Sequence, residues 1–301
     1  MIAKTNSKLC GFGFALTLLM SGCGGGGGGT SAPPPPPNQP PVAVVKLTGE
    51  AVLGTKTQFD TTGTGDADGT IASSSWNYGD GSTGSANSHI YAKTGSFTVS
   101  YSVTDNAGAS ASGTLNVTVA KCSATGTAAA VRSPFPTLCM QTSTGEMVLE
   151  VYPTQAPVTV ANFLRYVDDG FYAGSLFHRV VAGFVIQAGG YTTGLVAKPA
   201  TYAPIALESN NGLKNWQYTL AMARTNLPNT ATSQFYINLL AQPALDYDPS
   251  ITTPNGYAVF GQVISGTAVV DAIGTVATAT TGGLQNVPVQ DLVISSVVRM
   301  P

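Results

Sequence analysis

A glycine tract followed by a proline tract divides this chain of 301 residues near its beginning. Residues 24–29 read GGGGGG and residues 33–37 read PPPPP. Consecutive glycines behave as flexible coil, and consecutive prolines form a stiff, extended spacer without internal hydrogen bonds. Neither tract can join a packed core, so the folded part of the protein has to be built from residues 41–301.

The segment before the glycines has the features of a bacterial export signal. Lys4 and Lys8 precede the apolar run GFGFALTLLM, which is too short to span a membrane comfortably. The end of this segment, LLMSGC, resembles the lipobox of bacterial lipoproteins, although Met20 stands where Leu is usual. The resemblance implies that residues 1–22 are removed and that Cys23 is lipidated. An ordinary cleaved signal with an incidental cysteine is the alternative.

A lipidated Cys23 would attach the protein to a membrane, because two or more acyl chains give stable anchoring. The resemblance also bears on the membrane to which a lipoprotein is sorted. In enteric-type bacterial lipoproteins, Asp directly after the lipidated cysteine favours retention in the inner membrane. Gly24 holds that position here, so we expect an outer-membrane lipoprotein that faces the periplasm. Residues 23–40 then form a linker between the anchor and the first folded domain.

The composition excludes several classes of function. Charged residues make up only 9% of the chain, the net charge is -2, and no basic stripe suggests contact with nucleic acid. His89 and His178 are far apart and no Cys-x-x-Cys pair exists, so we expect no zinc site. No glycine-rich loop ends in Lys-Ser or Lys-Thr, which argues against nucleotide hydrolysis. We therefore predict neither a metal nor a cofactor.

Residues 41–119 contain several short segments with alternating or β-branched residues, separated by turn clusters such as YGDGSTG and DNAG. This spacing predicts an antiparallel sandwich. The stretch WNYGDG and the later stretch HIYAKTGSFTVSYSVTDNAG resemble a PKD repeat, which is an immunoglobulin-like β-sandwich. Trp76 is then expected in the core, and Gly79 and Gly81 in a tight turn. The resemblance implies adhesion, spacing or carbohydrate contact for this domain, with an envelope or cell-wall component as its partner.

Two polar features of this region have simple structural explanations. The sequence DADG, residues 66–69, could bind calcium, but it lacks the full ligand spacing of a dedicated calcium loop. An Asx-type turn is the favoured interpretation. His89 is expected to be a packed structural residue.

Residues 120–136 are rich in Ala, Ser, Thr and Pro without strong periodicity, and we interpret them as a linker. Once the signal is removed and Cys23 is modified, only Cys122 and Cys139 remain as thiols. In an oxidising compartment we expect them to form a disulfide, worth roughly 3 kcal/mol for a loop of about fifteen residues. Two free buried thiols are the alternative.

The remaining residues, 137–301, begin with the alternating segment MVLEVYP and a helical pattern over residues 158–168. The stretch FHRVVAGFVIQAGG follows, with Ala182 and Gly183 as a turn between two strands. Alternation puts Val185 and Gln187 on one face of the second strand. If the two strands pair, Arg179 and Gln187 share a groove. On pattern alone, a solvated strand residue is the simpler interpretation of such an arginine.

Three ordered motifs change that interpretation. FHRVVAGFVIQAGG, YTLAMARTNLPNTATSQFYIN and YAVFGQVISGTAVVDAI resemble the signatures of the cyclophilins, at the family's spacing. The resemblance implies a mainly β protein in which residues 137–301 form a closed eight-stranded antiparallel barrel. Two helices, near residues 158–168 and 267–273, are expected to cap this barrel.

The resemblance also implies a peptidyl-prolyl cis-trans isomerase with a defined set of groove residues. Arg179 and Gln187 are the expected catalytic residues, and His178 is expected to be structural. The expected substrate-binding residues form an apolar proline pocket and a set of contacts to the peptide carbonyls: Phe184, Val185, Met222, Ala223, Arg224, Gln234, Tyr236, Leu245 and Tyr257. Most members of the family have Phe at the position of Tyr236. The hydroxyl group of Tyr236 therefore needs a polar partner.

The expected substrates are extended X-Pro segments of exported or envelope proteins, which a monomeric enzyme would help to fold without any cofactor. One rival is a binding lipoprotein that recognises proline peptides without isomerising them, and another is a chaperone that holds chains in the groove. The intact set of Arg179, Gln187 and Gln234 favours the enzyme.

Overall fold

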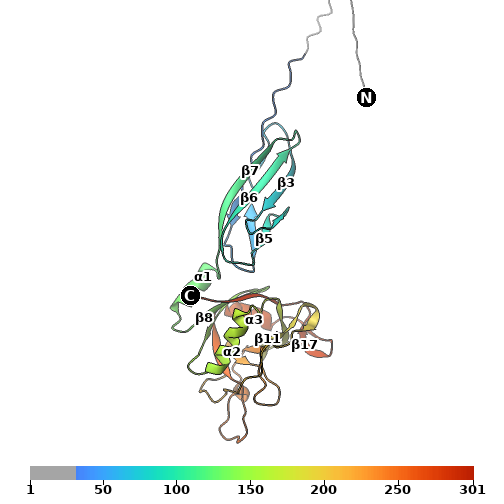
Figure 1. Ribbon diagram of the computed structural model, residues 1–301. Coiled ribbons are helices and arrows are strands. Elements are labelled where there is room, and N and C mark those ends of the chain that lie inside the picture. Colours follow the sequence, from blue (N-terminus) through green and yellow to red (C-terminus); the bar gives the residue numbers. More distant parts are fainter. Residues whose placement is uncertain (1–31) are drawn as a thin grey trace, which may run out of the picture. The chain divides into compact units, whose positions relative to one another are not determined.

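The computed structural model describes residues 32–301 (Figure 1). The predicted signal peptide and the predicted lipidation site at Cys23 lie outside these residues. Within the described part, the chain is mainly β, as predicted, with three α-helices. None of the helices found in residues 32–301 combines the length and the apolar character that a membrane crossing requires.

The first folded region consists of two antiparallel sheets. One sheet has the order β1 (Lys46–Thr48), β2 (Lys56–Asp60) and β5 (Ser88–Ile90). The other has the order β4 (Thr83–Gly84), β3 (Ile71–Asn77), β6 (Gly95–Asp105) and β7 (Ser110–Val119). The strands of each sheet present alternate residues to a common core, as expected for an antiparallel sandwich.

Aromatic rings fill the core of this sandwich. Trp76 on β3 is buried, with its ring centroid 5.1 Å from that of Phe59 and 4.4 Å from that of Tyr101. The turn that follows β3 requires Gly79, which has φ +84°, because a Cβ atom there would lie 2.6 Å from the carbonyl oxygen of Thr98. Sequence analysis therefore placed both the core tryptophan and the tight turn correctly.

The predicted linker contains a helix that the sequence pattern did not indicate, α1 (Ala124–Arg132). Ser123 caps the helix, with its hydroxyl oxygen accepting a hydrogen bond from the backbone N of Gly126 at 3.0 Å. The carboxylate of Glu146 accepts two hydrogen bonds from Ser123, at 2.7 Å from N and 2.6 Å from Oγ. Cys122 and Cys139 form a disulfide beside this cap. The helix thus depends on tertiary contacts, which periodicity does not report.

The second folded region is an eight-stranded antiparallel barrel, which closes because β10 pairs with both β11 and β18. Around the barrel the order is β10 (Ser175–Val181), β18 (Val293–Arg299), β8 (Thr137–Thr142), β9 (Gly145–Val151), β15 (Val259–Ser265), β13 (Thr219–Met222), β14 (Phe235–Asn238) and β11 (Val185–Thr192). Smaller elements decorate it: η1 (Thr193–Leu195), β12 (Val196–Ala197), η2 (Pro243–Leu245), and a hairpin of β16 (Thr278–Thr281) and β17 (Leu284–Pro288).

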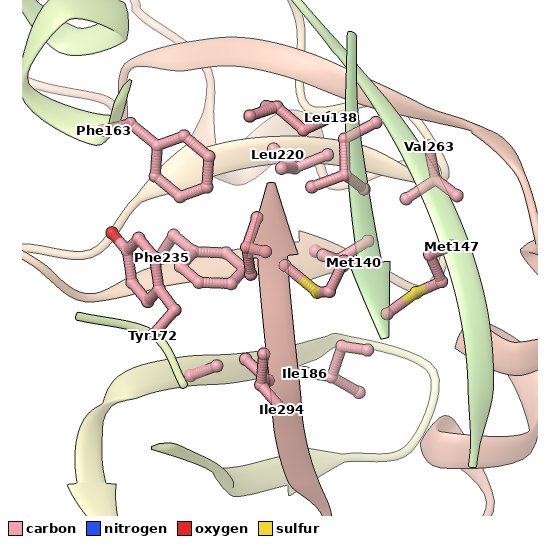
Figure 2. Close-up of a cluster of buried hydrophobic side chains, with 14 of the residues drawn as sticks. Leu138, Met140, Met147, Phe163, Tyr172, Ile186, Leu220, Phe235, Val263 and Ile294 are labelled. Carbon is pink, nitrogen blue, oxygen red and sulfur yellow. The ribbon is translucent and has the colours of Figure 1, made fainter. Parts of the chain in front are cut away.

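The interior of the barrel is apolar and closely packed, as Figure 2 shows for side chains from several strands. Two helices, α2 (Pro157–Asp168) and α3 (Thr267–Gly274), add buried residues such as Phe163 and Val270 to this core. Both helices lie close to the ranges predicted from the sequence. At the start of α2, the Glu208 carboxylate accepts hydrogen bonds from two free backbone N–H groups. Because side chains occupy the interior, a binding site has to lie on the outer surface of the barrel.

Candidate active site

Residues that lie opposite one another on adjacent strands form a row across five strands on the outer face of the barrel. Arg179 on β10 lies opposite Gln187 on β11, and Gln187 lies opposite Tyr236 on β14. Tyr236 lies opposite Ala221 on β13, which in turn lies opposite Val259 on β15. The neighbouring row, which includes Ile186 and Ile237, faces the barrel core instead. Strand alternation therefore gathers residues from distant parts of the sequence into one surface strip.

A cavity of about 160 Å³ opens along this row. Arg179 and Gln187 form one side of it, and the remaining lining residues are mostly apolar. The full lining is Arg179, Phe184, Val185, Gln187, Ala223, Arg224, Tyr236, Leu245 and Tyr257. The structure thus brings together nine of the residues that the sequence analysis assigned to catalysis or substrate binding.

The guanidinium group of Arg179 is half-buried and leaves most of its donors free. Within the part of the chain that the structure describes, its single hydrogen bond runs from Nη1 to Oε1 of Gln187 at 3.5 Å, a long distance for such a bond. Its Cζ atom lies 5.9 Å from the ring centroid of Phe184. Arginine stays protonated in proteins, so the cavity has a permanent cationic donor beside an apolar floor.

The second arginine of the cavity is arranged in the opposite way. Arg224 donates from Nε and Nη2 to the carbonyl oxygen of Gly256, at 3.0 and 2.9 Å, and from Nη1 to that of Thr225 at 2.9 Å. Its guanidinium also lies over the ring of Tyr257. These bonds engage all three guanidinium nitrogens of Arg224, which therefore shapes the wall, whereas Arg179 is available to a ligand.

Two glutamines continue the polar side of the groove. Gln187 donates from Nε2 to Oε1 of Gln234 at 2.9 Å, and its own Oε1 faces Arg179. Gln234 does not line the cavity of about 160 Å³ but a neighbouring cavity. Its position beside Gln187 still extends the hydrogen-bonding surface that we expected for the peptide backbone.

The hydroxyl group of Tyr236 has the polar partner that its position demands. The side chain is buried, and its hydroxyl donates to Oδ1 of Asn215 at 2.9 Å. Burial raises the pKa of this phenol well above its usual value, so the group remains a neutral donor. A tyrosine can therefore take the place of the usual phenylalanine without leaving an unpaired hydroxyl at the cavity wall.

Asn215 connects the part of the cavity wall formed by Tyr236 to the part formed by Leu245. Its backbone N donates to Oδ1 of Asp246 at 2.7 Å, and its backbone oxygen accepts from the N of Gln242 at 2.7 Å. Gln242 and Asp246 flank η2, the short helix that carries Leu245. One buried loop residue thus fixes both Tyr236 and Leu245, two walls of the same cavity.

Met222 is placed differently from our expectation. It is buried in the barrel interior and does not line the cavity. Residues alternate along β13 and into Ala223, which directly follows it. Ala221 and Ala223 belong to the outer, cavity side, while Leu220 and Met222 belong to the inner side. The motif located the correct strand, but strand parity gives Met222 a role in the core.

Comparison with known proteins agrees with this geometry. Residues 137–299, more than half of the chain, match the family model described as cyclophilin type peptidyl-prolyl cis-trans isomerase/CLD. The chain belongs to this cyclophilin family. A second model, described as PKD domain, matches residues 38–119.

The cyclophilin domain is similar to several bacterial proteins along most of their length. Peptidyl-prolyl cis-trans isomerase cyp18 of Streptomyces antibioticus is 51% identical over 162 residues, which cover 53% of this chain and 96% of that protein. Peptidyl-prolyl cis-trans isomerase B of Escherichia coli is 47% identical over 156 residues, covering 52% and 94%. A solved cyclophilin from Cryptosporidium parvum, crystallised in the presence of the dipeptide Ala-Pro, is 23% identical, with a TM-score of 0.46 and coverage of 55% and 99%.

Two features of the site in the cyclophilin domain were not predicted from the sequence. Asn215 lies in a loop, where no periodic pattern marks a buried residue. The β16–β17 hairpin lies beside Arg179 only because β17 packs against β10. Both contacts join segments that are far apart in the sequence, so only the folded structure reveals them.

Proposed function

We propose that the cyclophilin domain catalyses the cis–trans isomerisation of X-Pro peptide bonds. The observation that carries this proposal is the position of Arg179, a half-buried cation with free donors at the edge of an apolar cavity. The cavity would hold the proline ring, and the polar side of Arg179, Gln187 and Gln234 would hold the peptide backbone.

The chemistry requires no nucleophile and no titrating base. Rotation about an amide bond is opposed by resonance, with a barrier of about 18–20 kcal/mol. Twisting the X-Pro bond localises the lone pair on the proline nitrogen, which then accepts a hydrogen bond more strongly. A donor fixed beside that nitrogen stabilises the twisted state more than either planar state, and this difference lowers the barrier. Arg179 supplies such a donor.

A protease-coupled assay with a short X-Pro peptide tests this proposal. We expect the full chain to accelerate isomerisation and Arg179→Ala to lower kcat/KM by about 100-fold, which is typical for the loss of a donor to a transition state. Arg224→Ala is the matched control, because it removes a second cation from the same cavity. The guanidinium nitrogens of Arg224 are already bonded to backbone oxygens, so kcat/KM should fall clearly less than in Arg179→Ala. Equal activity of wild type and Arg179→Ala would contradict the proposal.

The site of action is a further part of the proposal. The signal-like residues 1–22 and the cysteine at position 23 support export and lipid anchoring in the cell envelope, where the enzyme would act on exported X-Pro chains. The PKD domain would then engage an envelope or cell-wall partner. Labelling of cells with radioactive palmitate, with Cys23→Ser as the control, tests the anchor. Label that persists in Cys23→Ser would contradict it.

A further inference from the structure

A second cavity adjoins the cavity of about 160 Å³ in which we place the proline ring. Its volume is about 290 Å³, and Arg179 and Gln187 belong to the lining of both cavities. The rest of the lining is His178, Tyr191, Gln234, Leu284, Gln285 and Asn286. Because two side chains form a common wall, one extended peptide can occupy both cavities at once.

The β16–β17 hairpin forms the outer wall of this cavity. Its strands pair in an antiparallel register from Thr278 opposite Pro288 to Thr281 opposite Leu284, and β17 packs against β10. Asn286 has φ +60°, a conformation that asparagine adopts more readily than most residues. The hairpin thereby holds two amide side chains, Gln285 and Asn286, at the cavity.

The lining of this cavity is polar, and one buried group in it has no partner. His178 is only 5% exposed, and its Nδ1 atom has no hydrogen-bond partner among the described residues. This atom is closed off from the cavity, so the hydrogen-bonding groups offered to a ligand come from the other lining side chains. Four amide side chains surround the cavity, and Arg179 is the only charged residue in its lining.

We propose that this second cavity is a subsite for the side chain of a substrate residue two positions from the proline, and that it selects glutamine or asparagine there. The inference rests on the proposed function, because it assumes that proline occupies the first cavity. In an extended peptide, residues two positions apart point to the same side. A primary amide both donates and accepts hydrogen bonds, as the lining does. A lysine would face Arg179, and a leucine would leave the amides unpaired.

Two series of X-Pro peptides test the subsite with the full chain. The peptides carry Gln, Leu or Lys two residues before the proline in one series and two residues after it in the other. We expect kcat/KM for Gln to exceed that for Leu by about tenfold in one of the series, with Lys lowest, since a few unpaired polar groups cost that much. Equal values for Gln and Leu in both series would overturn the proposal.

Variants of the hairpin separate the subsite from general effects. In Gln285→Ala we expect the ratio of kcat/KM for the Gln peptide to that for the Leu peptide to fall toward one. Gln290→Ala is the matched control, because Gln290 is exposed and does not line either cavity. A ratio that Gln285→Ala leaves intact would also contradict the inference.

Equilibrium binding of the same peptides distinguishes failure of the subsite from failure of the proposed function. Dissociation constants report the preference for Gln without requiring turnover. Selective binding of Gln peptides without isomerisation would support the subsite and disprove the enzyme. Isomerisation without any preference, in rates or in binding, would support the enzyme and disprove the subsite.

Discussion

The two histidines of the chain lie one in each β domain, and their surroundings differ. In the sandwich, His89 lies with Nε2 2.7 Å from Oδ2 of Asp80, and its ring stacks 4.2 Å from that of Tyr78. In the barrel, His178 is buried beside Arg179, and its Nδ1 has no partner among the described residues. Both domains contain buried polar atoms without a partner among the described residues, such as Thr57 Oγ1 in the sandwich, but His178 belongs to the lining of a cavity beside Arg179.

The comparison teaches where to look for function in two domains built from similar strands. Polar side chains that are held by neighbouring protein groups, such as His89 and Arg224, stabilise the fold. Polar side chains with unused donors in the lining of a cavity, such as Arg179, are available to a ligand. His178 and Arg179 occupy neighbouring positions of β10.

The largest effect that we predict tests whether the sandwich is structural alone. Trp76→Ala removes the buried ring at the centre of the aromatic core and should lower the free energy of unfolding of the sandwich by about 3–5 kcal/mol. Prolyl isomerase activity of the barrel should stay within about twofold of wild type, because no cavity residue changes. Urea unfolding and the peptide assay measure both quantities. A large loss of activity would show that the division between the two domains is wrong.

A second prediction concerns the pH dependence of stability. Burial lowers the pKa of His178 from 6.5 to about 4, so the folded protein keeps this ring neutral where the unfolded chain already binds a proton. Stability should therefore fall as the pH drops from 6.5 toward 4, by up to ~3 kcal/mol. His178→Gln should lose less stability over this range. Parallel pH curves for wild type and variant, from urea unfolding, would refute the assignment.

A smaller effect is expected at the loop residue that connects the two cavity walls. Asn215→Ala removes the acceptor of the Tyr236 hydroxyl and should raise KM by about tenfold with kcat changed by less than about twofold, because the loosened walls weaken binding of the proline. In a Tyr236→Phe background the same substitution should cost less, since part of the shared interaction is already absent. Additive effects of the two changes would argue against coupling through this bond.

The smallest predicted effect comes from Tyr236→Phe alone. The substitution deletes the hydroxyl but keeps the ring that forms the cavity wall, and phenylalanine is the usual residue of the family. We expect kcat/KM to change by no more than about threefold, since the apolar surface offered to proline is preserved. A loss comparable with that of Arg179→Ala would mean that the hydroxyl itself takes part in catalysis.

Much of this architecture could be predicted from the sequence because it depends on local patterns. Alternation, together with pairing of the two strands, placed Arg179 and Gln187 on one strip, and helical spacing located α2. The cyclophilin motifs located α3. Other features depend on which segments meet. Helix α1 forms where Ser123 meets Glu146 and where Cys122 meets Cys139.

The errors at the site have the same origin. The inward direction of Met222 follows from the register of β13, which the motif does not specify. The buried position of Asn215 depends on Tyr236 and on η2, which are separate in sequence. Motifs therefore identified the strands that build the cavity, and tertiary contacts decided which of their residues face it.

The central claim is that the open guanidinium of Arg179 stabilises the twisted X-Pro bond. The most direct measurement is NMR exchange spectroscopy on an X-Pro peptide at equilibrium, with binding affinity measured on the same samples. For Arg179→Ala we predict an exchange rate reduced by about 100-fold and a dissociation constant raised by only about threefold, because the apolar side chains that hold the ring, Gln187 and Gln234 all remain. An exchange rate that stays at the wild-type level while the peptide is bound would contradict the account.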